Sequence, residues 1–329
     1  MPNTPHDLFF RKIMERWQAV AAEMRAVLTP GMAALVDWTQ MTPVSKSFVA
    51  PPLRGRYSDV LFRTRIAGRP GFVYVLAEHQ SSSDELMAFR IVEYMVAIWN
   101  CYLEEHPGAK RLPMIIPLVV HCSPRGLRWN APMDLADLLD LNDSERATAG
   151  DLVPHVRYLL DDVNAVNAQQ LAERELPPDV LILLLLLREA PNNPLLVSLL
   201  LDWADELRAL IEEPGGLQRW ETVVTYIYTV NAGRIGIQDL DPVYDKLGEK
   251  AREVAVTIAE QLEARGEVRG EAKGRMAERA ETLMRLLTAR FVQLPDWVAD
   301  AVSAADMDRL EMWTLRILNA STVEDVFSV

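Results

Sequence analysis

The sequence predicts an α/β (α+β) core in the N-terminal part of the chain, followed by a mostly α-helical C-terminal half. Three strand-like runs support the core: residues 57–66, 72–80 and 114–121 are rich in β-forming residues and bounded by turn residues. Beyond Asp134, apolar residues recur mostly at helical spacing. The chain has 329 residues, 50% of them hydrophobic, and a mean hydropathy of zero. This composition is typical of a globular protein with two or more domains.

The first two strand-like runs predict a β-hairpin that brings two acids together. Between them, residues 67–70 include the Gly and Pro of a tight connection. If Ile66 and Gly71 flank a four-residue loop, Asp59 lies opposite Glu78. Because side chains alternate along a strand, Gln80 shares the face of Glu78. Two such carboxylates can hold a divalent cation against a phosphate.

A structural interpretation of the same acids stays open. Asp59 and Glu78 can be edge charges that are solvated or paired with nearby arginines. A one-residue slip in the hairpin register would place them on opposite faces of the sheet.

Helices are predicted before the hairpin and after it. Asp7 can cap the first helix. Ser82 and Glu85 have the spacing of a capping box, so the second helix should start there. Residues 114–121 then read as a buried strand, although Pro117 predicts an edge position or a bulge. The predicted order is helix, strands, helix, strand.

The charge is unevenly distributed along the chain. The net charge is −13, which argues against a nucleic-acid partner for the chain as a whole. Residues 1–130 hold 15 Lys and Arg against 11 Asp and Glu, which gives +4 and leaves −17 for the rest. Several arginines lie on or beside the predicted hairpin or follow the third strand: Arg54, Arg56, Arg63, Arg65, Arg69, Arg125 and Arg128. They can bind a phosphate backbone, or they can keep a solvated strand edge from pairing.

Arg90 and Glu93 interrupt the apolar surface of the second helix. An arginine one or two turns from a metal site can contact a phosphate. Equally, the two residues can form a solvated pair at adjacent helical positions.

Several motifs together resemble the recombination-promoting nuclease family, which is also described as transposases and belongs to the PD-(D/E)xK nuclease superfamily. The similarity lies in Pro5-His6-Asp7-Leu8-Phe9-Phe10-Arg11, Ser58-Asp59-Val60-Leu61, Val73-Tyr74-Val75-Leu76-Ala77-Glu78-His79-Gln80-Ser81-Ser82 and Phe89-Arg90-Ile91-Val92-Glu93-Tyr94, and continues through residues 116–121, 135–139 and 158–162. It covers most of the chain. The resemblance implies a restriction-endonuclease-like core and a DNA endonuclease that uses Mg²⁺, with Mn²⁺ or Ca²⁺ as substitutes.

The resemblance also assigns residues to roles. It implies that Asp59 is the metal-binding Asp, that Glu78 is the second acid, and that Gln80 stands where the wider superfamily has Lys. His6 and Asp7 match the family's N-terminal His-Asp pair and would be accessory residues. Gln80 departs from the pattern, because an amide can orient water but cannot act as a base.

The C-terminal part reads as helices. We expect a core helix around residues 180–187, another over 194–213, and either a helix or a strand over 217–230. A charged helical segment then carries Gly266, Gly270 and Gly274 on one face. These glycines favour a frayed linker over close approach of a partner helix, because glycine weakens helices.

Predicted domain boundaries follow from these patterns. They are 1–165 for the nuclease-like core, 166–240 for a helical extension, 241–279 for the charged linker and 280–329 for a small helical module. The module resembles a short domain of unassigned function that often ends proteins of this family. It could support a homo-oligomer or regulate access to the nuclease.

The cysteines and the apolar runs bear on the compartment. Cys101 and Cys122 could pair, but two reduced, buried thiols in a cytoplasmic protein are the favoured interpretation. The N-terminus lacks a secretory pattern, and the longest apolar run, residues 180–187, is too short to cross a bilayer, so no membrane partner is expected.

Two further functions are weighed against the nuclease. One is a catalytically inactive DNA- or protein-binding module derived from a nuclease. The other is a transposase, which would need a third acid in a matching strand context.

Overall fold

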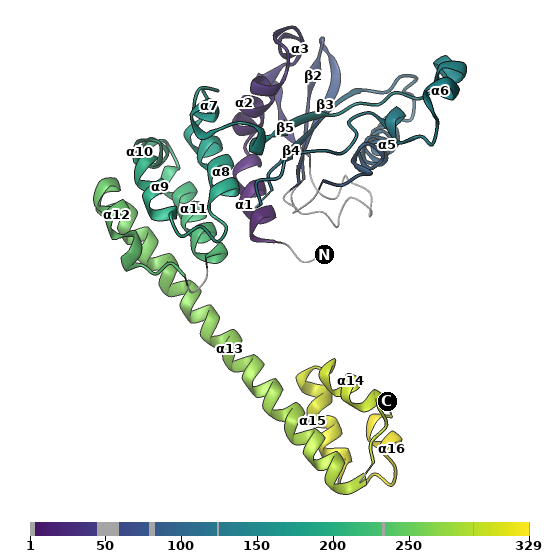
Figure 1. Ribbon diagram of the computed structural model, residues 1–329, viewed down its shortest axis with the longest axis vertical. Helices are drawn as coiled ribbons and strands as arrows, with labels where there is room; N and C mark the ends of the chain where they lie inside the picture. The colour runs from purple at the N-terminus through teal and green to yellow at the C-terminus, as the bar shows by residue number, and fades with distance from the viewer. Residues whose placement is uncertain are drawn as a thin grey trace. The chain divides into compact units, whose positions relative to one another are not determined.

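The structure is a computed structural model that describes residues 4–44, 59–78, 83–123, 125–231, 234–291 and 293–328 (Figure 1). The chain divides into two compact units, Met1–Ile258 and Ala259–Val329. The first unit contains a mixed sheet with helices, and the second is helical. The predicted fold class, an α/β core followed by a mostly helical remainder, is confirmed.

The sheet has five strands in the order β1-β2-β3-β4-β5. β1 pairs antiparallel with β2, and β2 with β3, whereas β4 runs parallel to both β3 and β5. The strands are Thr42–Pro43 (β1), Val60–Ile66 (β2), Arg69–Glu78 (β3), Met114–His121 (β4) and Leu159–Asp162 (β5).

The connection between β2 and β3 differs from the predicted four-residue loop. Ile66 pairs with Arg69, so only Ala67 and Gly68 form the turn, with φ of 49° and 74°. Positive φ at both central residues is typical of the tightest hairpin turns, whose twist matches that of the strands. The four-residue loop was wrong because Arg69 and Pro70 already belong to β3.

The tighter turn moves the register of the hairpin by two residues. Val60 pairs with Val75, so the same ladder continued by one step puts Asp59 opposite Leu76 and not opposite Glu78. Because the strand period is two, the shift keeps positions 59 and 78 on the same face. The predicted pairing of Asp59 directly opposite Glu78 is therefore wrong. The observed register still puts positions 59 and 78 on the same face of the sheet.

β4 is an interior strand of the sheet, but the predicted edge position holds locally at Pro117, where the β5 side of β4 is not yet paired. β4 is paired with β3 from Met114 to His121. Its ladder with β5 begins only at Leu118, immediately after Pro117. A proline removes one ladder hydrogen bond, and on the β5 side no partner has yet begun at this position.

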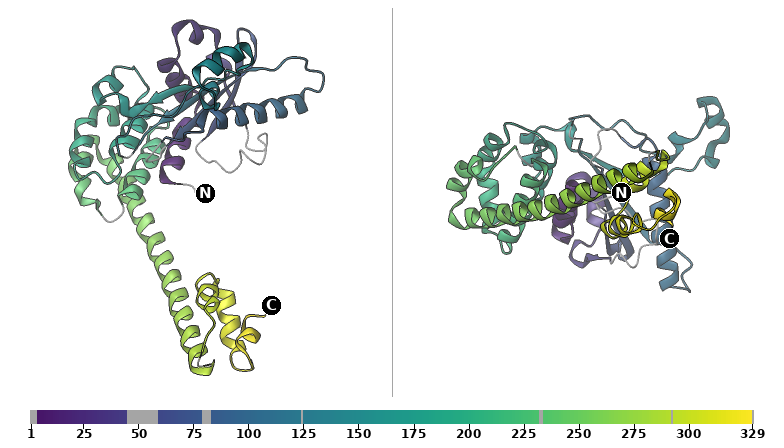
Figure 2. Two further views of the ribbon diagram at one scale, coloured as in Figure 1. Left: turned by 45° about the vertical axis from the view of Figure 1, so that its right-hand side comes forward. Right: turned by 90° about the horizontal axis from the view of Figure 1, so that it is seen from below.

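Helix α5, Met87–Glu105, covers one face of the sheet (Figures 1 and 2). It begins later than the capping box predicts: its N-cap is Leu86, whose N–H donates to Asp84 Oδ1 at 2.9 Å. Ser82 lies outside the described residues. The helix buries Met87, Ile91, Tyr94 and Ile98 against Leu61, Phe72, Tyr74, Leu76, Ile115 and Val119 of the strands.

The opposite face of the sheet packs against α2, Trp17–Val27. Next to α2 lie α1, Pro5–Met14, and α8, Pro178–Glu189. Every residue of α8 from Asp179 to Leu187 is buried, which confirms the predicted core helix. α8 also contacts α1, α10 and α11, so it joins the sheet to the helical part of the first unit.

The helical part of the first unit differs from the sequence patterns in one place. Residues 194–213 form two helices, α9 (Leu196–Asp202) and α10 (Ala204–Glu212), with Trp203 between them. Residues 217–230 are helical, within α11 (Gly216–Val230). The remaining short elements are α3 (Pro30–Leu35), η1 (Trp38–Gln40), η3 (Leu135–Leu138), α6 (Asp143–Ala149), η4 (Gly150–Leu152), η5 (Val163–Ala165), α7 (Ala168–Ala172), η6 (Gln238–Leu240) and α12 (Asp241–Leu247).

Helix α13, Glu249–Phe291, spans the boundary between the two units. It stays helical through Gly266, Gly270 and Gly274, so the expected frayed linker is wrong. A Cβ added at each of these glycines would meet no described atom within 4 Å. In the second unit, α13 shares an apolar core with α14 (Trp297–Ser303), α15 (Met307–Arg316) and α16 (Val323–Phe327).

Two further expectations concern the cysteines and the membrane. Cys101 and Cys122 are both buried, as predicted, and no disulfide joins them. Within the described part of the chain, none of the helices combines the length and the apolar character needed to span a bilayer.

Candidate functional site

Asp59 and Tyr74 form the best-defined part of the candidate site. Asp59 immediately precedes β2, and Tyr74 lies in β3 on the face that α5 covers. The Tyr74 hydroxyl donates a hydrogen bond of 2.5 Å to Asp59 Oδ2. This length is typical of a hydroxyl bound to an ionised carboxylate. The site therefore holds a carboxylate in one orientation where the sequence predicts a metal ligand.

Polar contacts continue from Tyr74 into α5. The ring of Tyr94 meets the ring of Tyr74 edge-on, with centroids 5.5 Å apart. Arg90 lies one helical turn earlier, donates to the Tyr94 hydroxyl at 3.4 Å and forms an ion pair with Asp84. The Arg90 side chain is 14% exposed. Arg90 therefore lies on the same side of the sheet as Asp59, as part of a bonded cluster.

Glu78 ends β3, and its backbone pairs with His121 of β4. The alternation of β3 places position 78 on the face of Tyr74. His121 is 1% exposed, and its Nε2–H donates to the Leu127 carbonyl at 3.1 Å. Its Nδ1 has no hydrogen-bond partner among the residues that the structure describes. Nδ1 of His121 thus lies at the end of β4, next to the end of β3 where Glu78 is the predicted second acid.

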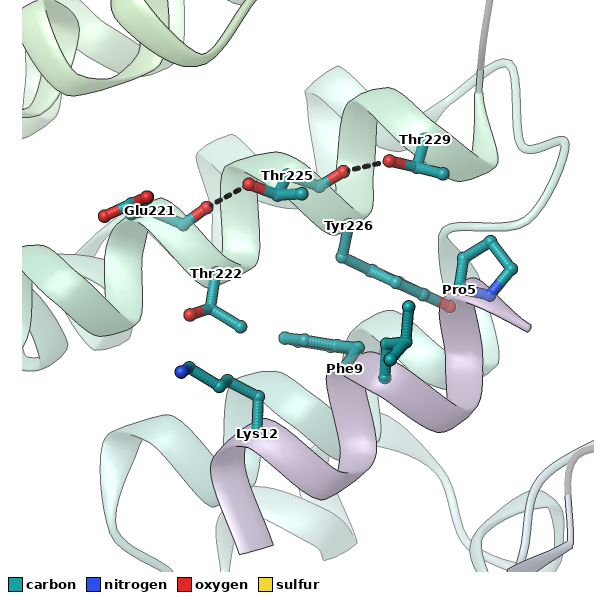
Figure 3. Close-up of a pocket in the computed structure, with 9 residues that line it drawn as sticks. Pro5, Phe9, Lys12, Glu221, Thr222, Thr225, Tyr226 and Thr229 are labelled. Atoms are coloured by element: carbon teal, nitrogen blue, oxygen red, sulfur yellow. Dashed lines mark hydrogen bonds between the residues drawn. The ribbon is translucent and has the colours of Figure 1, made fainter. Parts of the chain in front are cut away.

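His6 and Asp7 lie at the start of α1. Thr4 is the N-cap, and Asp7 completes a capping box with it through bonds of 3.2 Å in both directions. His6 Nδ1 is 2.8 Å from the Tyr226 hydroxyl of α11. Phe9 stacks on the Tyr226 ring (Figure 3). The contacts of His6 and Phe9 join α1 to α11, whereas that of Asp7 caps α1. Their predicted accessory role in catalysis stays a prediction.

The predicted arginines do not all gather at Asp59. Arg63 donates to Glu105 at 2.6 Å, and Arg65 donates to the Gly68 carbonyl at 2.7 and 3.1 Å. Both contacts lie toward the turn of the hairpin, whereas Asp59 lies at its other end. Arg54, Arg56 and Gln80 lie outside the described residues.

The donors at this site suit a hard cation. Mg²⁺ is commonly bound by one or two carboxylates together with substrate phosphate oxygens. Asp59 supplies one carboxylate, and position 78 carries a second acid on the same face. Within the described ranges, no group of three His, Cys, Asp or Glu side chains is placed to hold a metal. A metal site with Asp59 and Glu78 as its two carboxylates stays a prediction.

Sequence patterns alone do not single out Tyr74, Tyr94 or His121. All three read as core residues in apolar runs, and all three are buried. A buried hydroxyl or imidazole needs a hydrogen-bond partner. This requirement is the signal that could have marked Tyr74, Tyr94 and His121 as candidate site residues. The identity of that partner depends on the register between strands.

The chain also matches a known family. A family model described as "Putative transposase, YhgA-like" matches residues 4–216, more than half of the chain. The chain belongs to this family. This finding confirms the resemblance drawn from the sequence motifs, and the matched region contains Asp59, Tyr74, Glu78 and Arg90.

Curated relatives carry nuclease names. The chain is 38% identical over 120 residues to the recombination-promoting nuclease RpnA of Escherichia coli K12, covering 36% of this chain and 40% of RpnA. It is 31% identical over 145 residues to RpnD of Escherichia coli O157:H7, covering 44% of this chain and 54% of RpnD. A third relative, named an inactive recombination-promoting nuclease-like protein, is RpnE of Escherichia coli K12, with 28% identity over 132 residues, 39% of this chain and 44% of RpnE.

The chain therefore spans about half or less of the length of these relatives. No solved structure matches it.

Proposed function

We propose that this chain is a Mg²⁺-dependent DNA endonuclease with a PD-(D/E)xK-like site formed by Asp59, Glu78 and Gln80. The observation that carries the proposal is the Asp59 carboxylate, which Tyr74 orients on the face of the sheet that also carries position 78. The names of RpnA and RpnD support a nuclease, and family membership supports a role in DNA rearrangement.

Each protein group has a separate task in this mechanism. Asp59 and Glu78 hold the cation, and Tyr74 fixes the orientation of Asp59. When bound, the metal polarises the scissile phosphate and lowers the pKa of an attacking water. Gln80 has no basic group, so its amide orients that water without accepting its proton. Arg90 lies on the same side of the sheet and can compensate phosphate charge.

Plasmid cleavage tests this function. Purified protein is incubated with supercoiled DNA in Mg²⁺ and in EDTA, and nicked or linear product is expected only in Mg²⁺. Asp59→Ala and Glu78→Ala should each abolish cleavage. Asp205→Ala is the matched control, because the Asp205 side chain is 90% exposed and lies in α10. Unchanged cleavage in both site variants would refute the assignment.

A second candidate is an inactive binding module, and the existence of an inactive relative, RpnE, is the observation that favours it. DNA binding without cleavage in Mg²⁺ or Mn²⁺ would establish this alternative. A transposase is the third, suggested by the description of the family. Strand-transfer products from a mini-transposon would establish that activity in place of simple hydrolysis.

A further inference from the structure

The Tyr74 side chain combines a core position with a polar tip. It is 3% exposed and packs in the apolar cluster between the sheet and α5. Phe72, two residues earlier on the same strand face, is 2% exposed in the same cluster. Phe72 shows that a phenylalanine can fill a core position on this face. Packing alone therefore does not explain why residue 74 carries a hydroxyl group.

That reason is the bond to Asp59. A buried hydroxyl is costly unless it is hydrogen-bonded, and Tyr74 directs its own to Asp59 Oδ2 at 2.5 Å. The donor is a neutral hydroxyl, so it brings no positive charge to the carboxyl group. A carboxylate offers about four lone-pair sites, and the bond from Tyr74 occupies one of them. Tyr74 thereby orients Asp59 without adding a charge beside it.

From this geometry we infer that Tyr74 is a positioning residue that sets the affinity of the site for a divalent cation by holding the Asp59 carboxylate. The inference rests on the proposed function, since Asp59 must be a metal ligand. Mg²⁺ demands near-ideal ligand geometry, so an oriented carboxylate binds it better than a rotating one. Removing a hydrogen-bond partner of a metal ligand typically weakens metal affinity by about 10–100-fold.

Calorimetric titration with Mn²⁺ alone tests this role on the full chain. Tyr74→Phe keeps the ring against Tyr94 and removes only the hydroxyl. Its dissociation constant for Mn²⁺ should rise by about 10–100-fold relative to wild type. Tyr158→Phe is the matched control, because Tyr158 is equally buried in the same cluster but bonds to the Pro132 carbonyl and Trp129. The control should bind Mn²⁺ as wild type does.

Cleavage kinetics supply a readout that a merely structural role would not move. The Mg²⁺ concentration for half-maximal plasmid cleavage should rise in Tyr74→Phe, while the rate at saturating Mg²⁺ returns close to that of wild type. Tyr74→Met, which also lacks the hydroxyl and keeps an apolar side chain, should show the same shift. It provides the test if the phenylalanine variant does not fold by circular dichroism.

The outcomes separate the inference from the proposed function. If wild type binds Mn²⁺, Asp59→Asn does not, and the Tyr74 variants bind as tightly as Tyr158→Phe, the positioning role is overturned while the metal site stands. A loss of rate at every Mg²⁺ concentration without a shift in half-saturation would also overturn it. If wild type binds no Mn²⁺, the proposed function fails and the inference fails with it.

Discussion

Acids lie on both faces of the central sheet, but Asp59 on the α5 face is half-buried, whereas Asp161 and Glu23 on the α2 face are buried. On the α5 face, Asp59 accepts a hydrogen bond from the neutral Tyr74 hydroxyl. On the α2 face, Asp161 of β5 accepts a bond of 2.8 Å from Arg174, and Glu23 of α2 is fully buried beside them. The Arg174 guanidinium that bonds Asp161 is cationic, whereas the Tyr74 hydroxyl that orients Asp59 is neutral.

On the α2 face, the carboxyl group of Glu23 is protonated. Burial raises the pKa of Glu23 well above its usual value near 4.5, and the negative charge of Asp161 raises it further, while Arg174 acts in the opposite direction. Glu23 is therefore protonated where an exposed glutamate would be ionised. The comparison teaches that burial of an acid does not by itself identify a metal site. The chemistry of the partner matters as well: the Arg174 guanidinium bonds Asp161, whereas the partner seen at Asp59 is the Tyr74 hydroxyl.

The largest expected effect is on stability, on the α2 face. Arg174→Met removes the partner of Asp161, whose side chain is 4% exposed, and leaves a buried carboxylate. We expect a loss of about 3–5 kcal/mol in the free energy of unfolding, measured by urea denaturation. Arg208→Met is the control: its ion pair with Asp205 is exposed, so the loss should stay below about 1 kcal/mol. An equal loss of unfolding free energy in both variants would contradict the expected difference between a buried and an exposed ion pair.

The next effect is on catalysis, on the α5 face. Asp59→Asn keeps the shape of the side chain and removes its charge, so we expect plasmid cleavage in Mg²⁺ to fall by at least about 100-fold, since metal-ion catalysis contributes several kcal/mol. The free energy of unfolding should not fall as it does in Arg174→Met. Asp161→Asn is measured in parallel. At temperatures where this variant is folded, its plasmid cleavage should stay close to that of wild type. A larger loss of cleavage in Asp161→Asn would reverse the roles of the two faces.

A smaller effect concerns the proton on Glu23. The folded protein holds this proton at pH values where the unfolded chain has released it, because the folded pKa is raised. The contribution of Glu23 to stability is thus fully present below pH 4.5 and declines as pH rises toward the folded pKa, by at most about 1.4 kcal/mol per pH unit. Glu23→Gln cannot ionise and should lack this decline. Urea denaturation across pH 4.5–8 tests it, and a wild-type-to-variant difference independent of pH would contradict the protonated Glu23.

The smallest effect belongs to the arginines of the hairpin. Arg63 and Glu105 form a pair in which both side chains are more than one-third exposed, so Arg63→Gln should change stability by less than about 1 kcal/mol. If DNA crosses this face, the same variant weakens DNA binding at low salt and reduces the salt dependence by about one phosphate contact. Fluorescence anisotropy with a labelled duplex at several salt concentrations measures both quantities. An unchanged salt dependence would exclude Arg63 from the DNA contacts.

Local patterns predict the fold well where short-range physics determines it. The three main strands and the buried helix α8 follow from runs of β-formers and from an apolar stretch bounded by prolines. The start of α5 was misplaced because Ser82 and Glu85 resemble a cap, while the backbone N–H of Leu86 bonds Asp84 instead. The edge position predicted for Pro117 holds only locally, because β5 begins to pair with β4 at the next residue, Leu118.

The site was less predictable than the fold, for a physical reason. The turn used Ala67 at positive φ, which few non-glycine residues adopt, so the sequence favoured a longer loop and a register two residues away. The shared face of positions 59 and 78 survived because an even shift preserves strand parity. The hydrogen bond between Tyr74 and Asp59 could not be predicted from the sequence. It depends on the strand register and on a side-chain rotamer, and no local pattern specifies either.

A crystal structure of the protein with Mn²⁺ would test the central claim most directly. The account predicts one ion bound by Asp59 and Glu78, with the Tyr74 hydroxyl still bonded to Asp59. An ion bound elsewhere, or the two carboxyl groups on opposite sides of the sheet, would contradict it.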